Sequence, residues 1–263
     1  MSAFSSHPPV TVAYWAIRGL AAPLRQMVMY AGVPLNNVMY EITGEAGSFS
    51  ADEWFSVKPS LKEQHPLINL PYVVDGEVVV TQTNACMAYL GRKFGMWGDT
   101  AQEQIQCECM DLRNRMISFA YGRDKTTHTA AISEAQGKNS QLQKLELWLE
   151  KRVKDGGSGG FLVGEKATAP DFALFEMLVQ YTALAEFCSA GPLLGNYPRL
   201  SHFFKTFAEL PGNARYLGHK VGSSKPLYVP FNNKSALFGG SCELTPWGAE
   251  SRNDLDDVKN CVL

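Results

Sequence analysis

The sequence has few cysteines, and none of them has the spacing of a structural metal site. The six form no CxxC pair, and no histidine spacing suggests zinc. Cys107 and Cys109 lie two residues apart in a segment of helical character, so their side chains point to different faces. We therefore expect no bound metal, and free thiols at Cys86, Cys107, Cys109, Cys188, Cys242 and Cys261.

A long apolar run is also missing. No window approaches the ~20 apolar residues of a membrane-spanning helix. The opening MSAFSSHPPVTV has neither the basic region nor the apolar run of a signal peptide. The expectation is a soluble, cytoplasmic protein that has no membrane partner.

Neither sign of charge is in marked excess. The 24 Lys and Arg residues and 26 Asp and Glu residues give a formal net charge of -2, and no basic block stands out. Proteins that bind nucleic acid usually need such a block, so nucleic acid is not an expected partner. The hydrophobic fraction of 45% is that of a globular protein with a packed core. A chain of 263 residues favours two modest domains.

The first 94 residues alternate between strand and helix patterns. A strand is indicated by PVTVAYW, a helix directly after it by AAPLRQMVMYAG, and a second strand by NNVMYEIT. A polar loop from Gly44 to Glu53 precedes a short helical or irregular segment that opens with Trp54 and Phe55. A hairpin that turns at Asp75-Gly76, followed by a helix, is predicted by NLPYVVDGEVVVTQTNACMAYLGRKFG. Residues 9–94 are thus predicted to form an α/β domain of order β-α-β-α-β-β-α.

The second half shows helical periodicity only. Helical stretches are indicated by QIQCECMDLRNRMISFAYG, SEAQGKNSQLQKLELWLEKRV, PDFALFEMLVQYTALAEF and PRLSHFFKTFAEL. We predict an all-α domain over residues 101–230, in which Thr168 caps a helix and Asp171 reaches back to its start. The stripe FALFEMLVQY is interpreted as core packing. Residues 231–263 are polar and lack periodicity, which predicts a flexible tail.

Tyr14 ends the first predicted strand. Tyr is a good strand former, so it can be an ordinary boundary aromatic there. A buried Tyr hydroxyl must also find a hydrogen-bond partner. The strand pattern alone leaves both interpretations open.

Several motifs, taken in order, resemble the cytosolic glutathione S-transferases of the tyrosine type. The opening YWAIRGLAAPLR resembles the mu class, NLPYVVDG with VTQTNA resembles the glutathione-binding region of the mu and pi classes, and DLRNRMISFAY resembles a pi-class helix. GFLVGEKATAPDF resembles the folding motif of the family's second domain. The resemblance spans Pro9 to Pro230 and leaves the mu, pi and sigma classes open. It implies a thioredoxin-like N-terminal domain followed by an all-helical domain.

The resemblance assigns a function to Tyr14. In these classes the Tyr that closes the first strand donates a hydrogen bond to the glutathione sulfur. A thiol has a pKa near 8.5, and a donor that favours its charged form lowers that pKa. More thiolate, the nucleophilic form, is then present at neutral pH.

The resemblance also implies the residues that bind the rest of glutathione. Leu70 precedes a cis-proline, Pro71, and would offer its backbone to the tripeptide, although Pro71 could equally be a turn that starts the hairpin. Gln82 and Thr83 would bind the γ-glutamyl carboxylate at a helix start, where Thr83 could instead simply cap the helix. The remaining positions are Trp54 and Lys58 for the glycyl carboxylate, Trp15 and Leu20 in the same groove, and Asn69, which is also a common turn residue.

Two residues of DLRNRMISFAY complete the implied site. Asp111 matches an acid that reaches the glutathione amino group from the partner subunit. The segment from Gly98 to Asp111 is, however, several residues shorter than in the family, and a five-residue change rotates a helix face by well over 90°. Tyr121 matches a Tyr that hydrogen-bonds the second substrate, or it is a core aromatic.

The expected protein is a homodimeric transferase. Its co-substrate would be glutathione, and no metal is required. The Tyr14-activated thiolate would attack a hydrophobic electrophile held in the same cleft. The alternatives are a glutathione-dependent isomerase or peroxidase of the prostaglandin-synthase kind, and a non-catalytic binding protein of the same fold.

Overall fold

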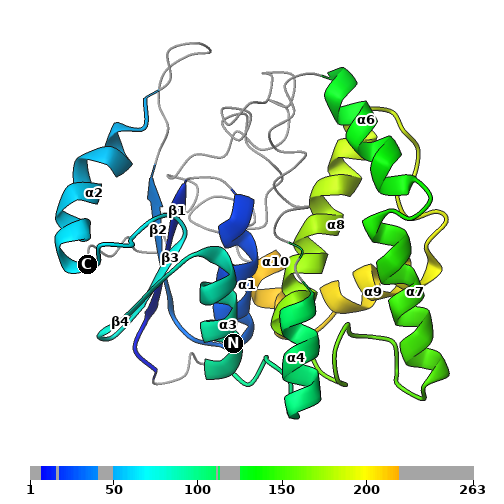
Figure 1. The fold of residues 1–263 in the computed structure, drawn as a ribbon, viewed down its shortest axis with the longest axis horizontal. Coiled ribbons are helices and arrows are strands. Elements are labelled where there is room, and N and C mark those ends of the chain that lie inside the picture. Colours follow the sequence, from blue (N-terminus) through cyan, green and yellow to red (C-terminus); the bar gives the residue numbers. More distant parts are fainter. Residues whose placement is uncertain (1–6, 16–17, 41–49, 111, 113–124, 219–263) are drawn as a thin grey trace.

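The computed structural model describes residues 7–15, 18–40, 50–110, 112 and 125–218. An α/β half is followed by a helical half that lies beside it (Figure 1). The predicted fold class, a thioredoxin-like domain followed by an all-α domain, is therefore confirmed. The predicted tail, residues 231–263, lies outside the described residues.

Four strands form one mixed sheet in the order β2-β1-β3-β4. They are β1 (Val10–Trp15), β2 (Leu35–Tyr40), β3 (Tyr72–Asp75) and β4 (Val78–Thr81). β1 and β2 are parallel, whereas β3 is antiparallel to both β1 and β4. In the β3–β4 turn Gly76 has a φ of +59°, a conformation that glycine adopts without a steric penalty. Because β1 and β2 are parallel, Tyr14 and Trp15 lie at the same edge as the end of β2.

Helices cover both faces of the sheet, α2 on one face and α1 with α3 on the other (Figure 1). Their bounds are η1 (Gly19–Ala21), α1 (Ala22–Tyr30), α2 (Asp52–Gln64) and α3 (Thr83–Lys93). The sequence predicts a loop up to Glu53 and a short helical or irregular segment after it. α2 confirms the helical alternative and corrects its start and length, because the helix begins at Asp52 and has 13 residues. Pro59 lies within α2, although proline is untypical of a helix interior. One face of the helix is buried at Trp54 and Leu61.

The helical half contains six described helices: α4 (Ala101–Cys109), α6 (Lys125–Gln136), α7 (Gln141–Lys154), α8 (Ala169–Phe187), α9 (Pro198–Ala208) and α10 (Asn213–Gly218). The stretch predicted as one helix around SEAQGKNSQLQ is two, α6 and α7. Asn139 interrupts it with a φ of +63°, and the Ser140 hydroxyl accepts a hydrogen bond from the Gln143 backbone N–H (3.1 Å) at the start of α7. α4 ends at Cys109, and most of the predicted continuation of that helix lies outside the described residues.

The apolar core is continuous between the two halves. One cluster of buried side chains joins β1, α1 and α3 to α4, α7, α8 and α9. A second, smaller cluster lies under α2 and contains Trp54, Leu61, Ile68 and Tyr72. Tyr14 belongs to the larger cluster, which the two halves share.

Gly91 allows α3 to approach the start of α8. A methyl group at this position would lie 2.6 Å from Trp97 Cε3 and 3.3 Å from Ala169 Cβ. We expect Gly91→Ala to lower the free energy of unfolding by about 1–3 kcal/mol, because the extra carbon overpacks a buried junction. Urea denaturation measures this change. Gly160→Ala is the control, since its methyl group meets nothing closer than 3.6 Å; equal losses in the two variants would contradict the packing argument.

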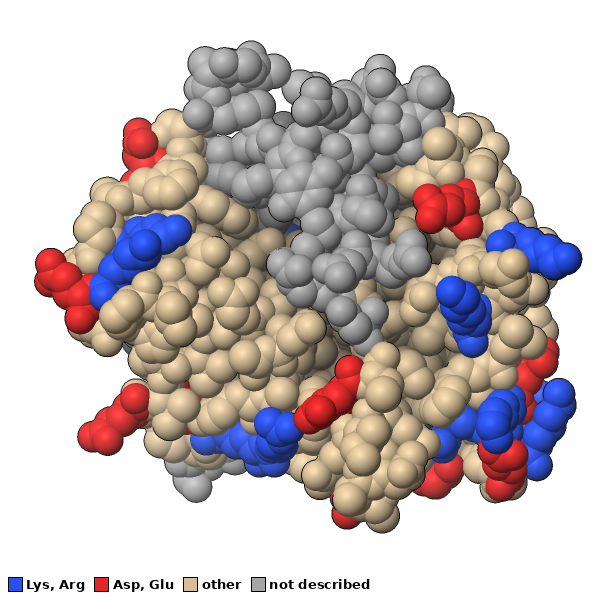
Figure 2. All heavy atoms as spheres, in the orientation of Figure 1, with Lys and Arg blue, Asp and Glu red and all other residues tan. Residues whose placement is uncertain are grey.

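The described surface has mixed charge. On the face shown in Figure 2, Lys and Arg side chains are interspersed with Asp and Glu. Within the described ranges, no helix is long and apolar enough to span a membrane, and no group of three His, Cys, Asp or Glu side chains is placed to hold a metal ion.

Candidate functional site

Tyr14 lies at the carboxyl end of β1, opposite Met39 of β2. Its side chain is 8% exposed and packs on the α1 side of the sheet. Trp15, the next residue, faces the opposite side because side chains alternate along a strand, and its ring centroid is 6.5 Å from that of Trp54. The end of β1 therefore contributes an aromatic side chain to each face of the sheet.

The Leu70–Pro71 peptide bond is cis, as the resemblance implies, and it leads directly into β3. Hydrogen bonds hold the loop before it against β4. The Asn69 N–H donates to Thr81 Oγ1 (3.1 Å), and that hydroxyl donates to the Asn69 carbonyl (2.8 Å). This pair of bonds fixes the backbone of Asn69 next to Leu70.

Gln82 and Thr83 lie where β4 passes into α3. Gln82 has a φ of +75° and occupies the cap position, where no side chain of the described residues caps the helix. Thr83 is the first helical residue and is buried. The alternative in which Thr83 merely caps α3 therefore does not fit its position. The first N–H groups of α3 can donate hydrogen bonds to a bound anion, and the helix dipole also favours an anion there.

Trp54 and Lys58 lie one helical turn apart on α2. Trp54 is 1% exposed, because Tyr40, Tyr72 and Trp15 surround its ring at centroid distances of 5.1, 6.3 and 6.5 Å. Lys58 Nζ lies 5.3 Å from the Trp54 ring and donates a hydrogen bond to Asn69 Oδ1 (3.3 Å). The fold thus brings together three of the predicted residues, Trp54, Lys58 and Asn69.

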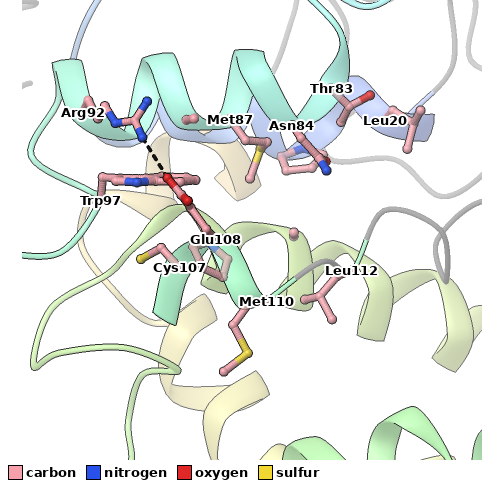
Figure 3. A pocket seen from close by; sticks show the side chains of 14 residues that line it. Leu20, Thr83, Asn84, Met87, Arg92, Trp97, Cys107, Glu108, Met110 and Leu112 are labelled. Atoms are coloured by element: carbon pink, nitrogen blue, oxygen red, sulfur yellow. Dashed lines mark hydrogen bonds and ion pairs between the residues drawn. The ribbon is translucent and has the colours of Figure 1, made fainter. Parts of the chain in front are cut away.

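A cavity of about 360 Å³ lies between α3 and α4. Figure 3 shows Thr83 and Asn84 at one end of α3 and Arg92 near the other, with α4 and Met110 opposite. The predicted residues Leu20 and Thr83 line it together with residues that the sequence did not single out, namely Met87, Arg92, Trp97, Glu108, Met110 and Leu112. No sequence signal predicts this lining, because it depends on how α3 packs against α4.

An exposed ion pair, Trp97 and Cys107 line the part of the cavity near Arg92. Arg92 Nη2 donates to Glu108 Oε1 at 3.0 Å, and the Arg92 guanidinium lies 5.2 Å from the Trp97 ring (Figure 3). Cys107 also lines the cavity. Burial raises the pKa of the Cys107 thiol to about 11, so this cysteine is protonated at neutral pH and is a poor nucleophile.

Two predicted residues, Asp111 and Tyr121, lie outside the described residues. Leu112, which follows Asp111 in the sequence, is buried at the wall of the cavity. α4, which leads toward Asp111, ends two residues before it.

A buried ion pair that the sequence analysis missed joins Arg18, four residues after Tyr14, to Glu176 of α8. Arg18 Nε donates to Glu176 Oε1 at 2.8 Å, and Nη2 donates to the other carboxylate oxygen. Glu176 belongs to the stripe FALFEMLVQY, which was interpreted as core packing only. A single acid within such an apolar helix was the available signal, since a buried charge needs a partner.

Comparison with known protein families assigns a family to each half of the chain. Residues 10–92 match the glutathione S-transferase N-terminal domain family, and residues 110–220 match the C-terminal domain family. Glutathione S-transferase Mu 5 of Mus musculus is 30% identical over 242 residues, which cover 90% of this chain and 99% of the mouse protein. The chain belongs to the glutathione S-transferase family.

Further relatives support the same family assignment. Glutathione S-transferase 2 of Gallus gallus is 32% identical over 234 residues, which cover 86% of this chain and 98% of the chicken protein. The crystal structure of the glutathione S-transferase Blo t 8 superposes with a TM-score of 0.63 at 25% identity, and the match covers 80% of this chain and 92% of that one. Several of the relatives are Mu proteins, which makes the chain mu-like.

Proposed function

We propose that this protein is an enzyme that transfers glutathione to hydrophobic electrophiles, with Tyr14 as its catalytic residue. The observation that carries the proposal is the position of Tyr14, at the edge where β1 and β2 end, in a chain of this family. Its hydroxyl would donate a hydrogen bond to the glutathione sulfur and favour the thiolate. Glutathione is the co-substrate, and the reaction needs no metal. All the relatives compared are named glutathione S-transferases, which favours conjugation over the isomerase, peroxidase and binding-protein alternatives.

The rest of glutathione would lie along the edge of the sheet. The Leu70 backbone, next to the cis Pro71, would pair with the tripeptide as an added strand does. Thr83, Gln82 and the first amides of α3 would bind the γ-glutamyl carboxylate, where the absence of a side-chain cap among the described residues supports this role.

The glycyl carboxylate would lie near Lys58, Asn69 and Trp54. The hydrogen bond of Lys58 to Asn69 and its position over the Trp54 ring place a positive charge there. Trp15 and Leu20 would line the groove between thiol and electrophile. Asp111 of a partner subunit would approach the glutathione amino group, and Tyr121 would contact the second substrate.

We further propose the organisation and setting of the protein. Residues 9–94 would form the glutathione-binding domain and residues 101–230 the domain that holds the second substrate, followed by a tail over 231–263. The protein would act in the cytoplasm as a homodimer. No membrane or nucleic acid would be a partner.

Product analysis tests the proposed reaction. The purified protein is incubated with glutathione and a nitro-substituted aryl chloride, and the products are identified by mass. A thioether conjugate whose amount depends on enzyme supports the proposal. Oxidised glutathione alone would indicate a peroxidase, and glutathione binding without turnover would indicate a binding protein.

Replacing Lys58 tests the carboxylate end. We expect Lys58→Met to raise KM for glutathione about tenfold, or ~1.4 kcal/mol, with little change in kcat, because a charge-assisted contact far from the sulfur contributes equally to ground and transition states. Steady-state kinetics with varied glutathione measures both constants. Lys62→Met, at an exposed position on the same helix, should leave both unchanged. A drop in kcat with unaltered KM would contradict this placement.

A further inference from the structure

Arg18 lies between two parts of the proposed site. It follows Tyr14 by four residues and directly precedes η1, which carries Leu20. Its backbone carbonyl accepts a hydrogen bond from the Ala22 N–H (3.0 Å) at the start of α1. The position of Arg18 therefore affects η1 and the start of α1, which lead to the cavity.

The partner of Arg18 comes from the other half of the chain. Glu176 lies near the middle of α8, and the two side chains are 3% and 1% exposed. The guanidinium binds both carboxylate oxygens, and Gln180 Nε2 donates to Oε1 from the next turn of α8. A two-point contact of this kind sets direction as well as distance.

Stability alone does not account for such a pair. Two charges lose their hydration on burial, and well-packed apolar residues in their place are often equally stabilising or more so. What the ion pair supplies and an apolar contact lacks is a defined orientation of Arg18, and with it the start of α1, against α8. α1 in turn carries Arg25, which contacts the carbonyl of Trp15, the residue after Tyr14.

Other charged and titratable groups pack around the same point. Arg25 of α1 is buried, donates to Asn37 Oδ1 at 2.8 Å and makes a longer contact, 3.4 Å, with the carbonyl of Trp15. Burial lowers the pKa of Arg25 to about 10 and the charge of Arg18 acts in the same direction, whereas the Glu176 carboxylate acts in the opposite direction. Arg25, Arg18, Glu176 and Tyr216 thus lie within electrostatic range of one another, and Arg25 connects this group to the end of β1.

We propose that Glu176, acting through Arg18, is a positioning residue that fixes the direction in which Tyr14 presents its hydroxyl to the glutathione sulfur. The inference rests on the proposed function. It assigns the helical half a part in activating the thiol, in addition to holding the second substrate.

Two variants that keep every charge test this role. Glu176→Asp withdraws the carboxylate by one methylene, and Arg18→Lys loses the two-point contact. In both we expect the pH midpoint of the thiolate absorbance of bound glutathione to rise by about half to one unit. We expect kcat below that midpoint to fall about tenfold, with a smaller change in KM for glutathione.

The double variant Arg18→Met, Glu176→Leu keeps the test valid if the single variants unfold. An apolar pair should preserve the fold, and its net charge is that of the wild type, so a raised midpoint in a stable protein reports lost positioning. Gln26→Met is the control. It removes another buried hydrogen bond between the halves, from Gln26 Nε2 to Asn213 Oδ1 (2.9 Å), and should lower the melting temperature without moving the midpoint.

The outcomes separate the two proposals. A wild-type protein without a thiolate band or conjugate would overturn the proposed function and this inference with it. A wild-type band whose midpoint and kcat are unchanged in the Arg18 and Glu176 variants would overturn only the inference, because the pair would then be structural. A raised midpoint in those variants, together with an unmoved one in Gln26→Met, supports it.

Discussion

Tyr14→Phe is expected to lower kcat for conjugation by about 10- to 100-fold near pH 6.5. The variant loses one hydrogen bond to a charged sulfur, worth about 1.5–3 kcal/mol. Each 1.4 kcal/mol corresponds to about one unit in the pKa of the bound thiol, so less thiolate is present at this pH. The ring is retained, and because Tyr14 packs in the larger core cluster, the fold should be little affected.

The pH dependence of the thiolate absorbance is the most direct measurement of this effect. Ultraviolet difference spectra of bound glutathione, titrated with pH, should show a band in the wild type below the pKa of the free thiol. In Tyr14→Phe the band should appear about one to two pH units higher. Tyr30→Phe, at the end of α1, is the control for loss of a Tyr hydroxyl elsewhere and should leave the band unchanged. Full conjugating activity in Tyr14→Phe would refute the role given to its hydroxyl.

Asp171→Ala is expected to cause the largest loss of stability, about 3–5 kcal/mol. Asp171 is fully buried and accepts three hydrogen bonds of 2.7 Å, from the backbone N–H of Leu162, the backbone N–H of Thr168 and the Thr168 hydroxyl. Removing the carboxylate leaves three donors without an acceptor, and each costs about 1–3 kcal/mol when buried. Urea denaturation gives the loss directly.

The chain contains a matched control for this motif. Thr100 and Glu103 form the same capping box at the start of α4, where Glu103 Oε2 accepts from the N–H groups of Asp99 (2.7 Å) and Thr100 (3.0 Å). Those groups are exposed, so water replaces the lost acceptor, and Glu103→Ala should cost only about 1 kcal/mol. A similar loss in the two variants would mean that burial does not determine the cost.

Local patterns predicted most of the secondary structure. The strand and helix around Tyr14, the hairpin at Gly76 and the capping box at Asp171 each depend on neighbouring residues, and the structure confirms all three. The length of α2 was underestimated because its first residues belong to a polar run that was predicted as a loop, while burial of Trp54 against the sheet favours a helix. That burial depends on Tyr40 and Tyr72, which are distant in sequence.

The candidate site divides in the same way. The roles of Tyr14, Pro71 and Thr83 were implied by the ordered motifs that resemble the glutathione S-transferases, and each residue lies at the start or end of an element that local patterns indicate. The Arg18–Glu176 pair joins residues 158 positions apart, and the cavity between α3 and α4 depends on packing between helices. The cavity leaves no signal in any short window of sequence, whereas Glu176, a single acid in an apolar stripe, indicates that a partner exists but not which residue it is.

The apolar core is divided into a large and a small cluster. In the proposed binding mode each cluster supports one end of glutathione, and the two clusters differ in stability. Proteins open in cooperative units, and the units with fewer buried contacts open at lower free energy. The small cluster under α2, which carries Trp54 and faces Lys58, is such a unit, whereas Tyr14 belongs to the large cluster shared by both halves. In the proposed binding mode, opening of α2 would release the glycyl end of the tripeptide while Tyr14 stays in place, so product release would not disturb the groups proposed to carry out the reaction.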